Sequence, residues 1–109
     1  MAWLLRDGEV LASLEIADGA MARTRGLLGR DDLEGALLLK PAMSVHTLGM
    51  RFALDVAFCD RDLAVVDIVC GMHPWRLGRP RFGARSVIEA EAGSFERWKL
   101  AVGDVLEVQ

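Results

Sequence analysis

The sequence contains no tyrosine, two cysteines, two histidines and three prolines among its 109 residues, and these scarcities exclude several kinds of protein. Two cysteines cannot build the disulfide framework that stabilises many small secreted domains. The histidines, His46 and His73, do not form a close pair of the kind that zinc sites use. We therefore predict no metal site and no cofactor. Long hydrophobic runs are also missing, and because a spanning helix needs about 20 apolar residues, we predict no membrane span.

The chain also lacks a large excess of positive or negative charge. The chain has 13 lysine and arginine residues against 16 aspartate and glutamate residues, which gives a net charge of -3. Because affinity for nucleic acid grows with the number of phosphates neutralised, we expect no nucleic-acid partner. The N-terminal stretch does not show the basic-then-apolar order of a secretion signal. This favours a cytoplasmic protein, or an exported domain whose leader has been removed.

The composition that is present, 52% hydrophobic and 27% charged residues, is typical of a globular chain. The length predicts a single domain over residues 1–109. We predict a hairpin over 3–17 turning at Asp7-Gly8, a strand over 36–41 ended by Pro41, a central hairpin over 51–74, strands at 86–92 and 105–108, and helices near 19–28 and 94–98, the second capped by Ser94. The predicted fold class is α+β, with a strand-rich, mostly antiparallel barrel-like or curled sheet and one or two short helices.

The central hairpin carries both cysteines. If residues 60–62 form its turn, Cys59 lies near the turn and Cys70 lies about seven residues along the returning strand. At roughly 3.3 Å per residue the two are about 20 Å apart, which is beyond the reach of a disulfide. We predict that both cysteines are reduced and buried.

An aspartate interrupts the otherwise apolar first strand of this hairpin. With Cys59 opposite Leu63, the apolar side chains of both strands share one face, and Asp55 lies opposite Asp67 on the other face. Their Cβ atoms would then be roughly 5 Å apart. We interpret the two carboxylates as the acidic wall of a shallow pocket. In the alternative interpretation, Asp55 hydrogen-bonds a loop backbone and Asp67 is exposed.

The segment "PWRLGRPRFGAR" (74–85) combines aromatic and basic residues. Its composition is suited to binding phosphate or a single-stranded nucleic acid, through Trp75, Phe82 and four arginines. The acidic total of the chain argues against nucleic acid. A loop that packs its aromatic rings on the sheet and points its arginines at nearby acids explains the same residues, so both interpretations stay open.

The blocks "RTRGLLGRDDL", "VHTLGMRFALDVAF", "PWR", "VIEAEAGS" and "GDVLEV" resemble the signature of the domain of unknown function 192 family. The resemblance covers nearly the whole chain. It implies a small strand-rich α+β domain and carries no established activity. The motifs single out Thr47, Asp55, Pro74, Trp75, Glu89, Gly93 and Asp104. The sequence departs from the family pattern at Ala53, where proline is usual, and at His46, where an amide residue is common.

Three functions are open on these observations. The first is a small binding module with a pocket for a small polar ligand or a peptide end, and its candidate ligand-binding residues are His46, Thr47, Asp55, Asp67, Trp75 and Arg76. The second is a hydrolase-like or isomerase-like enzyme that uses Asp55 and His46 in acid–base chemistry. The third is a protein–protein adaptor that uses a strand edge or the Trp75 loop. The sequence gives no oligomeric state.

Overall fold

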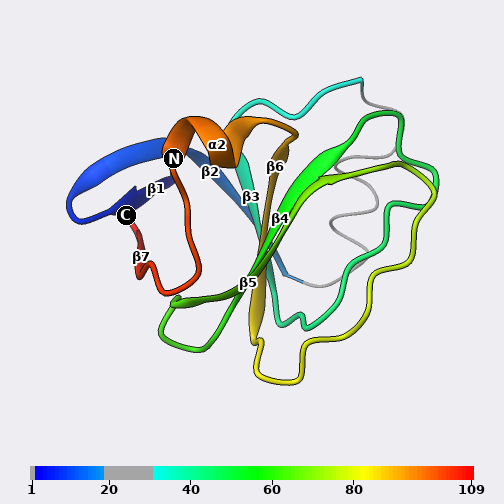
Figure 1. Cartoon of the computed structure of the whole chain (residues 1–109). Coiled ribbons are helices and arrows are strands. Elements are labelled where there is room, and N and C mark those ends of the chain that lie inside the picture. Colours follow the sequence, from blue (N-terminus) through cyan, green and yellow to red (C-terminus); the bar gives the residue numbers. More distant parts are fainter. Residues whose placement is uncertain (1, 19–30) are drawn as a thin grey trace.

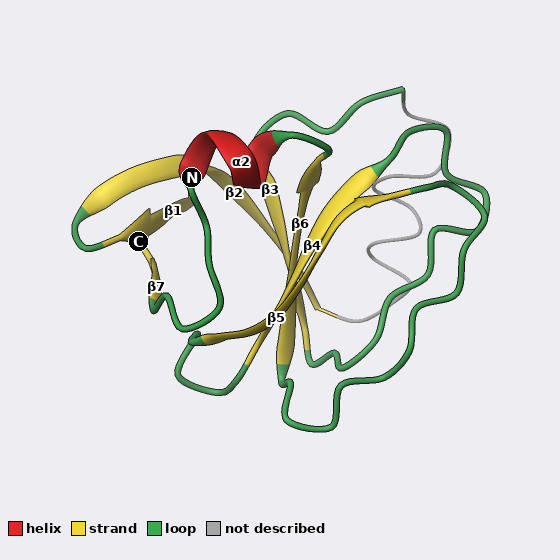
Figure 2. Cartoon of the chain, in the orientation of Figure 1, coloured by secondary structure: helices red, strands yellow, loops and turns green. Residues whose placement is uncertain are grey.

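Seven strands in one sheet form most of the structure, which is a computed structural model that describes residues 2–18 and 31–109 (Figure 1). The strands are β1 (Ala2–Arg6), β2 (Glu9–Asp18), β3 (Ala36–Lys40), β4 (Leu54–Cys59), β5 (Val65–Met72), β6 (Ser86–Glu91) and β7 (Leu106–Val108). Their order across the sheet is β5-β4-β6-β3-β2-β1-β7. One helix is described, α2 (Ser94–Trp98), and Figure 2 shows it at one end of the sheet. The helix predicted near 19–28 lies outside the described residues.

The sheet curls until its two edge strands meet at one end. Ala64, beside β5, forms a β-bridge with Val105, beside β7. The Val65 N–H donates to the Asp104 carbonyl at 2.8 Å, and the Leu106 N–H donates to the Leu63 carbonyl at 2.9 Å. Every neighbouring pair of strands is antiparallel except β2 and β3, which are parallel. The result is a half-barrel, which confirms the predicted α+β curled sheet.

The predicted N-terminal hairpin forms around a tight turn. Asp7 and Gly8 have φ values of 52° and 76°, so both central residues are left-handed, as a two-residue hairpin turn with the right twist requires. β1 then pairs on its other side with β7, and Trp3 and Gln109 exchange two backbone hydrogen bonds of 2.7 and 3.0 Å.

Apolar side chains pack on both faces of the sheet. The inner core, on the concave face, contains Leu4, Leu14, Leu38, Ala57, Ile88, Phe95 and Leu106, among others. The outer core, beneath the segments that follow β3 and β5, includes Leu37, Val45, Met50, Val56, Phe58 and Val87. β4 contributes to both cores, and none of its six residues is more than 1% exposed.

The predicted register of the central hairpin is wrong. Cys59 pairs with Val65 rather than with Leu63, and the pairing shifts twice along β4. Asp67 consequently lies opposite Phe58 and not opposite Asp55. The physical reason is that β-bulges add unpaired residues, and a change of one residue moves a side chain to the other face.

Both cysteines are free, as predicted. Cys59 is buried at the end of β4, but Cys70 is exposed, so the predicted burial of Cys70 is wrong. The difference follows from position, because β4 lies inside the sheet and β5 is an edge strand.

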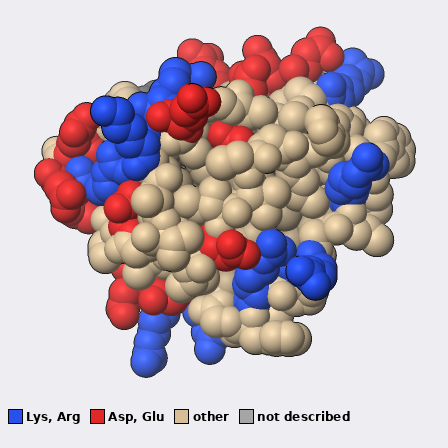
Figure 3. All heavy atoms as spheres, in the orientation of Figure 1, with Lys and Arg blue, Asp and Glu red and all other residues tan. Residues whose placement is uncertain are grey.

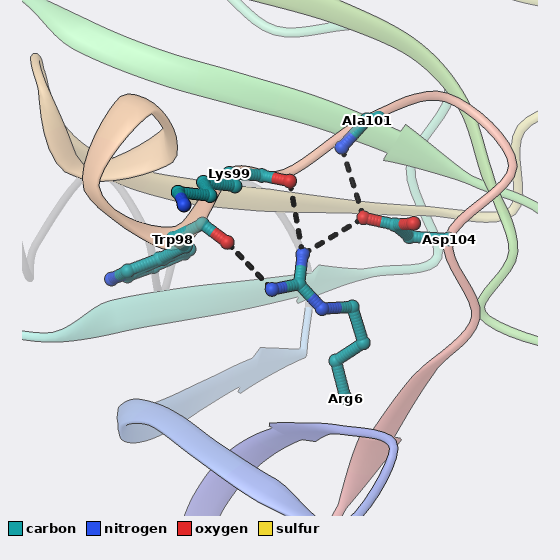
Figure 4. A network of polar contacts seen from close by, with 5 residues as sticks. All are labelled: Arg6, Trp98, Lys99, Ala101 and Asp104. Atoms are coloured by element: carbon teal, nitrogen blue, oxygen red, sulfur yellow. Dashed lines mark hydrogen bonds and ion pairs between the residues drawn. The ribbon is translucent and has the colours of Figure 1, made fainter.

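A guanidinium from β1 ties α2 to the approach of β7 (Figure 4). Arg6 donates from Nη2 to the Trp98 carbonyl at 2.6 Å, and from Nη1 to the Lys99 carbonyl at 3.2 Å and to Asp104 Oδ2 at 2.9 Å. The same Asp104 oxygen accepts the Ala101 N–H at 2.9 Å. The cation thereby satisfies carbonyl groups at the C-terminal end of the helix, where positive charge is favourable.

Candidate functional site

The buried side chain of Thr47 joins the two loops that carry most of the predicted site residues. Its hydroxyl donates to the His73 carbonyl at 2.6 Å and accepts the Arg76 N–H at 2.9 Å. Its backbone N–H donates to the Arg76 carbonyl, and its carbonyl accepts the Trp75 N–H, both at 2.9 Å. Thr47 is 0% exposed. Its structural effect is to fix the turn at residues 73–76.

The backbone pairing of these loops continues beyond the turn. The Gly78 N–H donates to the Val45 carbonyl at 2.9 Å, and the Arg81 N–H donates to the Met43 carbonyl at 2.8 Å. His46 forms a β-bridge with Leu77. Residues 43–48 and 75–81 therefore run side by side as a two-stranded ribbon, which we call the Trp75 ribbon.

Trp75 itself lies in an unusual backbone conformation. Its φ is 63°, a left-handed value that bulky residues rarely adopt and that costs roughly 1–3 kcal/mol. Its side chain is nevertheless 66% exposed, so burial of the indole does not offset this strain. Leu77 on the same ribbon is 76% exposed. The hydrogen bonds of Thr47 hold the turn in the conformation that displays Trp75 to solvent.

Asp55 uses its carboxylate to join three elements. Oδ1 accepts the Gly71 N–H of β5 at 2.8 Å, and Oδ2 accepts the N–H groups of Gly93 and Phe95, each at 3.0 Å. Gly93 is the N-cap of α2 and has no side chain, so Asp55 on β4 satisfies the first helical N–H groups instead. The predicted cap, Ser94, makes no capping bond and accepts a hydrogen bond from Arg97. Asp55 is 1% exposed.

Asp67 belongs to a different cluster. Its Oδ2 accepts a hydrogen bond from Arg81 Nε at 2.8 Å, and the Arg81 guanidinium lies 4.2 Å from the centre of the Phe58 ring. The hydrogen bond from Arg81 holds the pKa of Asp67 below its usual range. The predicted acidic wall of Asp55 and Asp67 is therefore wrong, because the bulged register separates the two carboxylates.

The structure thus brings four of the predicted site residues together, His46, Thr47, Trp75 and Arg76, on the Trp75 ribbon. A buried carboxylate that was not among the predicted site residues is Glu89, 0% exposed on β6, where it pairs with Leu37 of β3 and Val56 of β4. The alternation of "SVIEAEA" gives no signal for this burial, because Glu89 shares a face with Glu91, which is exposed.

Sequence reasoning also missed the cavities, because each is built from elements far apart in the chain. One of about 450 Å³ lies among β2, the segment before β3 and α2, and one of about 430 Å³ lies at the end of the sheet where β3 finishes and β6 begins. Within residues 2–18 and 31–109, no three His, Cys, Asp or Glu side chains gather as a metal site would require. None of the described helices has the length and apolar character to cross a membrane.

Charged groups avoid the centre of one face of the molecule. Figure 3 shows most lysine, arginine, aspartate and glutamate side chains around the rim of this face, with an area of other residues over β4 and β5. Uncharged side chains therefore form the centre of the side of the molecule that also carries the two paired loops (Figure 1).

The chain is similar to known proteins in both sequence and fold. A UPF0127 protein of Pyrococcus furiosus is 33% identical over 104 residues, covering 91% of this chain and 89% of that protein, and one of Pyrococcus abyssi is 31% identical over 99 residues, covering 86% and 84%. The fold is similar to a crystal structure of a protein of unknown function from Novosphingobium aromaticivorans, with a TM-score of 0.80 and 22% identity over 97% of this chain and 82% of the other. The family DUF192, described as an uncharacterized group, matches residues 2–108. This chain belongs to the DUF192 family.

Proposed function

We propose that this protein is a binding module that recognises a peptide segment through the Trp75 ribbon. The observation that carries the proposal is the conformation of Trp75, which combines a strained φ of 63° with a side chain that is 66% exposed. Strain of this kind persists where the surrounding structure enforces it, and it concentrates at functional sites. Here the enforcing contacts are the hydrogen bonds of the buried Thr47.

The hydrogen bonds of Asp55 and Asp67 favour this proposal over an acid–base enzyme and over a pocket for a small polar ligand. Asp55 is buried, and both of its oxygens accept backbone N–H groups, so an acid–base role would first have to break bonds that hold β5 and α2. A pocket for a small polar ligand would draw on Asp55 and Asp67 together, and Asp67 is engaged with Arg81 elsewhere. His46 and Arg76 stay within the proposed surface as neighbours of Trp75.

The chemistry of the ribbon indicates what kind of peptide would bind. Trp75 and Leu77 offer exposed apolar surface, and aromatic side chains are common anchors of protein interfaces. Arg76 and Arg79 are exposed on the same ribbon and form no ion pair within the described part of the chain. Arginine pairs well with carboxylates through its planar fork of donors. We therefore propose an acidic peptide segment that carries at least one apolar side chain.

Peptide display provides the test. Random peptides would be selected on the wild-type protein and then counter-selected on the Trp75→Gly variant. Glycine adopts positive φ without strain, so we expect this variant to fold and to gain about 1 kcal/mol in its free energy of unfolding. The peptides that survive should combine aspartate or glutamate with leucine or an aromatic residue, and should bind the variant at least about tenfold more weakly.

The matched control is Trp3→Ala, which removes another exposed tryptophan from a distant strand, β1. Enriched peptides should bind this control as they bind the wild type. Failure to enrich any peptide, or enriched peptides that bind Trp75→Gly as well as the wild type, would overturn the proposal.

A further inference from the structure

The cavity of about 430 Å³ lies in the mouth of the half-barrel. Its lining comes from β2, β3, β6, β7 and the turn between β4 and β5, and consists of Ile16, Leu38, Lys40, Asp60, Arg61, Leu63, Arg85, Ser86 and Val108. Because side chains alternate along a strand, Lys40 shares the inner face with Leu38, and Ser86 shares it with Ile88. The cavity is thus the open end of the space that the inner core fills, where β3 finishes and β6 begins.

The cavity combines an apolar wall with a set of cations. Four of the nine lining side chains are aliphatic and form the apolar wall, whereas Lys40, Arg61 and Arg85 contribute positive charge. None of these three forms an ion pair with a carboxylate in the part of the chain that the structure describes. The one carboxylate of the lining, Asp60, is engaged through Oδ1, which accepts the N–H groups of Asp62 and Ala64 at 2.9 and 3.0 Å.

Ser86 adds a polar group at the inner end of β6. The residue is 5% exposed, and its buried hydroxyl has no hydrogen-bond partner among the described residues. Buried polar groups nearly always find a partner, because leaving one unsatisfied costs the free energy of its desolvation. A serine hydroxyl needs only a rotation about χ1 to donate toward a ligand on the same face.

We propose that this mouth binds a small amphipathic anion, a carboxylate or phosphate group joined to a short apolar chain. The cations would neutralise the head group, Ser86 would donate to it, and the chain would lie against Leu38, Leu63 and Val108. The volume falls within the range of small-molecule sites, and barrel mouths are a frequent place for them. A neutral ligand would leave the cations without a partner, and a long polyanion would leave the apolar wall without one.

The site is separate from the Trp75 ribbon. It lies on the inner face of the sheet, whereas the ribbon is formed by the segments that cover the outer core. The two proposals therefore stand or fall independently. Arg51, which is exposed and lies outside both the ribbon and the lining, provides a matched control for the loss of a cation.

The experiment is an NMR titration of the whole protein with octanoate, octyl phosphate and octanol as probes. We expect both anions to shift the amide signals of Leu38, Leu63, Ser86 and Val108 to saturation, and octanol to bind at least about tenfold more weakly. The double variant Arg61→Gln/Arg85→Gln should lose about tenfold in affinity for the anions, Ser86→Ala should also weaken binding, and Arg51→Gln should bind as the wild type does.

The head group is identified by the ratio of the two anion affinities, with tighter binding of octanoate assigning a carboxylate and tighter binding of octyl phosphate assigning a phosphate. Saturable shifts confined to other residues, equal affinity for octanol, affinities undiminished in both cavity variants, or the absence of binding by all probes would overturn the proposal. Because the arginine side chains of the double variant are exposed, its unfolding transition should match that of the wild type and serves as the check on folding.

Discussion

Asp55, on strand β4, caps the N-terminus of helix α2. A cap residue normally precedes its helix directly, but the N–H groups that Asp55 accepts lie 38 and 40 residues further along the chain. The sequence therefore indicated that this aspartate was out of place in an apolar strand without indicating its partner. The backbone hydrogen bonds of the alternative interpretation are present, but they come from Gly71 of β5 and from the start of α2, and Asp67 is bonded to Arg81. Only tertiary folding supplies these partners.

We predict that Asp55→Asn lowers the free energy of unfolding by about 2–4 kcal/mol. The amide keeps one acceptor oxygen, but its NH₂ group turns a donor toward backbone N–H groups that are also donors. Urea unfolding followed by circular dichroism measures the change. Asp62→Asn, at an exposed position of the β4–β5 turn, is the control and should change stability by less than about 0.5 kcal/mol. Equal effects of the two substitutions would contradict the structural role of Asp55.

The two thiols should differ sharply in reactivity. Burial, with a smaller contribution from the charge of Asp60, raises the pKa of Cys59 to about 12, so the thiolate fraction at pH 8 is on the order of 10⁻⁴. Cys70 is exposed, although desolvation and nearby carboxylates also raise its pKa. We expect iodoacetamide to modify Cys70 alone in the native protein, faster as pH rises, and both cysteines in urea. Peptide mapping by mass spectrometry reads this out, and native modification of Cys59 would show that the end of β4 opens.

At the scale of elements, the connection from α2 to β7 depends on one ion pair. The Ala101 N–H and then the Arg6 guanidinium hold the pKa of Asp104 below its usual range. A carboxyl whose pKa is lower in the folded state than in the unfolded state stabilises the fold above its unfolded pKa, which is near 4. This stabilisation is lost as the pH falls through the folded-state pKa.

We therefore predict that the wild type loses stability as pH falls below about 4, and that Asp104→Asn loses less over the same interval while being less stable at pH 7. The bond from Arg81 also lowers the pKa of Asp67, so Asp67 contributes to the loss of stability in acid as well. Asp104→Asn should therefore reduce that loss only in part. Thermal unfolding between pH 7 and pH 3 provides the measurement. An acid limb of unchanged slope in the variant would show that Asp104 is not among the groups that titrate on unfolding.

The elements that sequence reasoning predicted well are those whose signals are local. The Asp7-Gly8 turn, the end of β3 before Pro41 and the short helix at 94–98 each depend on a few adjacent residues. The register of β4 and β5 depends on bulges that have no signature in the alternation of apolar residues. The parallel pairing of β2 with β3 was likewise beyond reach, because it joins strands that are not consecutive hairpin arms. For the site, the Trp75 loop could be singled out by composition, whereas its strained backbone and the cavity in the barrel mouth could not.

At the scale of the whole molecule, stability should decrease from the centre of the sheet to its edges. β4 and β6 each have a strand on both sides and are almost wholly buried, whereas β7 has three residues and pairs with β1 along one side. We predict that amides of 54–59 and 86–91 exchange with deuterium at least about tenfold more slowly than those of 106–108. Hydrogen exchange with mass spectrometry tests this order, and uniform protection across the sheet would instead indicate one cooperative unit without local opening.

The pairing of β1 with β7 has a consequence for synthesis. A ribosome makes β1 first and β7 last, so during translation the first strand can pair with β2 but must leave its other edge open. Only when the segment ending at Gln109 has left the exit tunnel can Trp3 form its two bonds and the approach of β7 join the start of β5. The nascent chain therefore exposes a hydrogen-bonding edge until the last strand arrives, and this is the interval in which a chaperone would have most to protect.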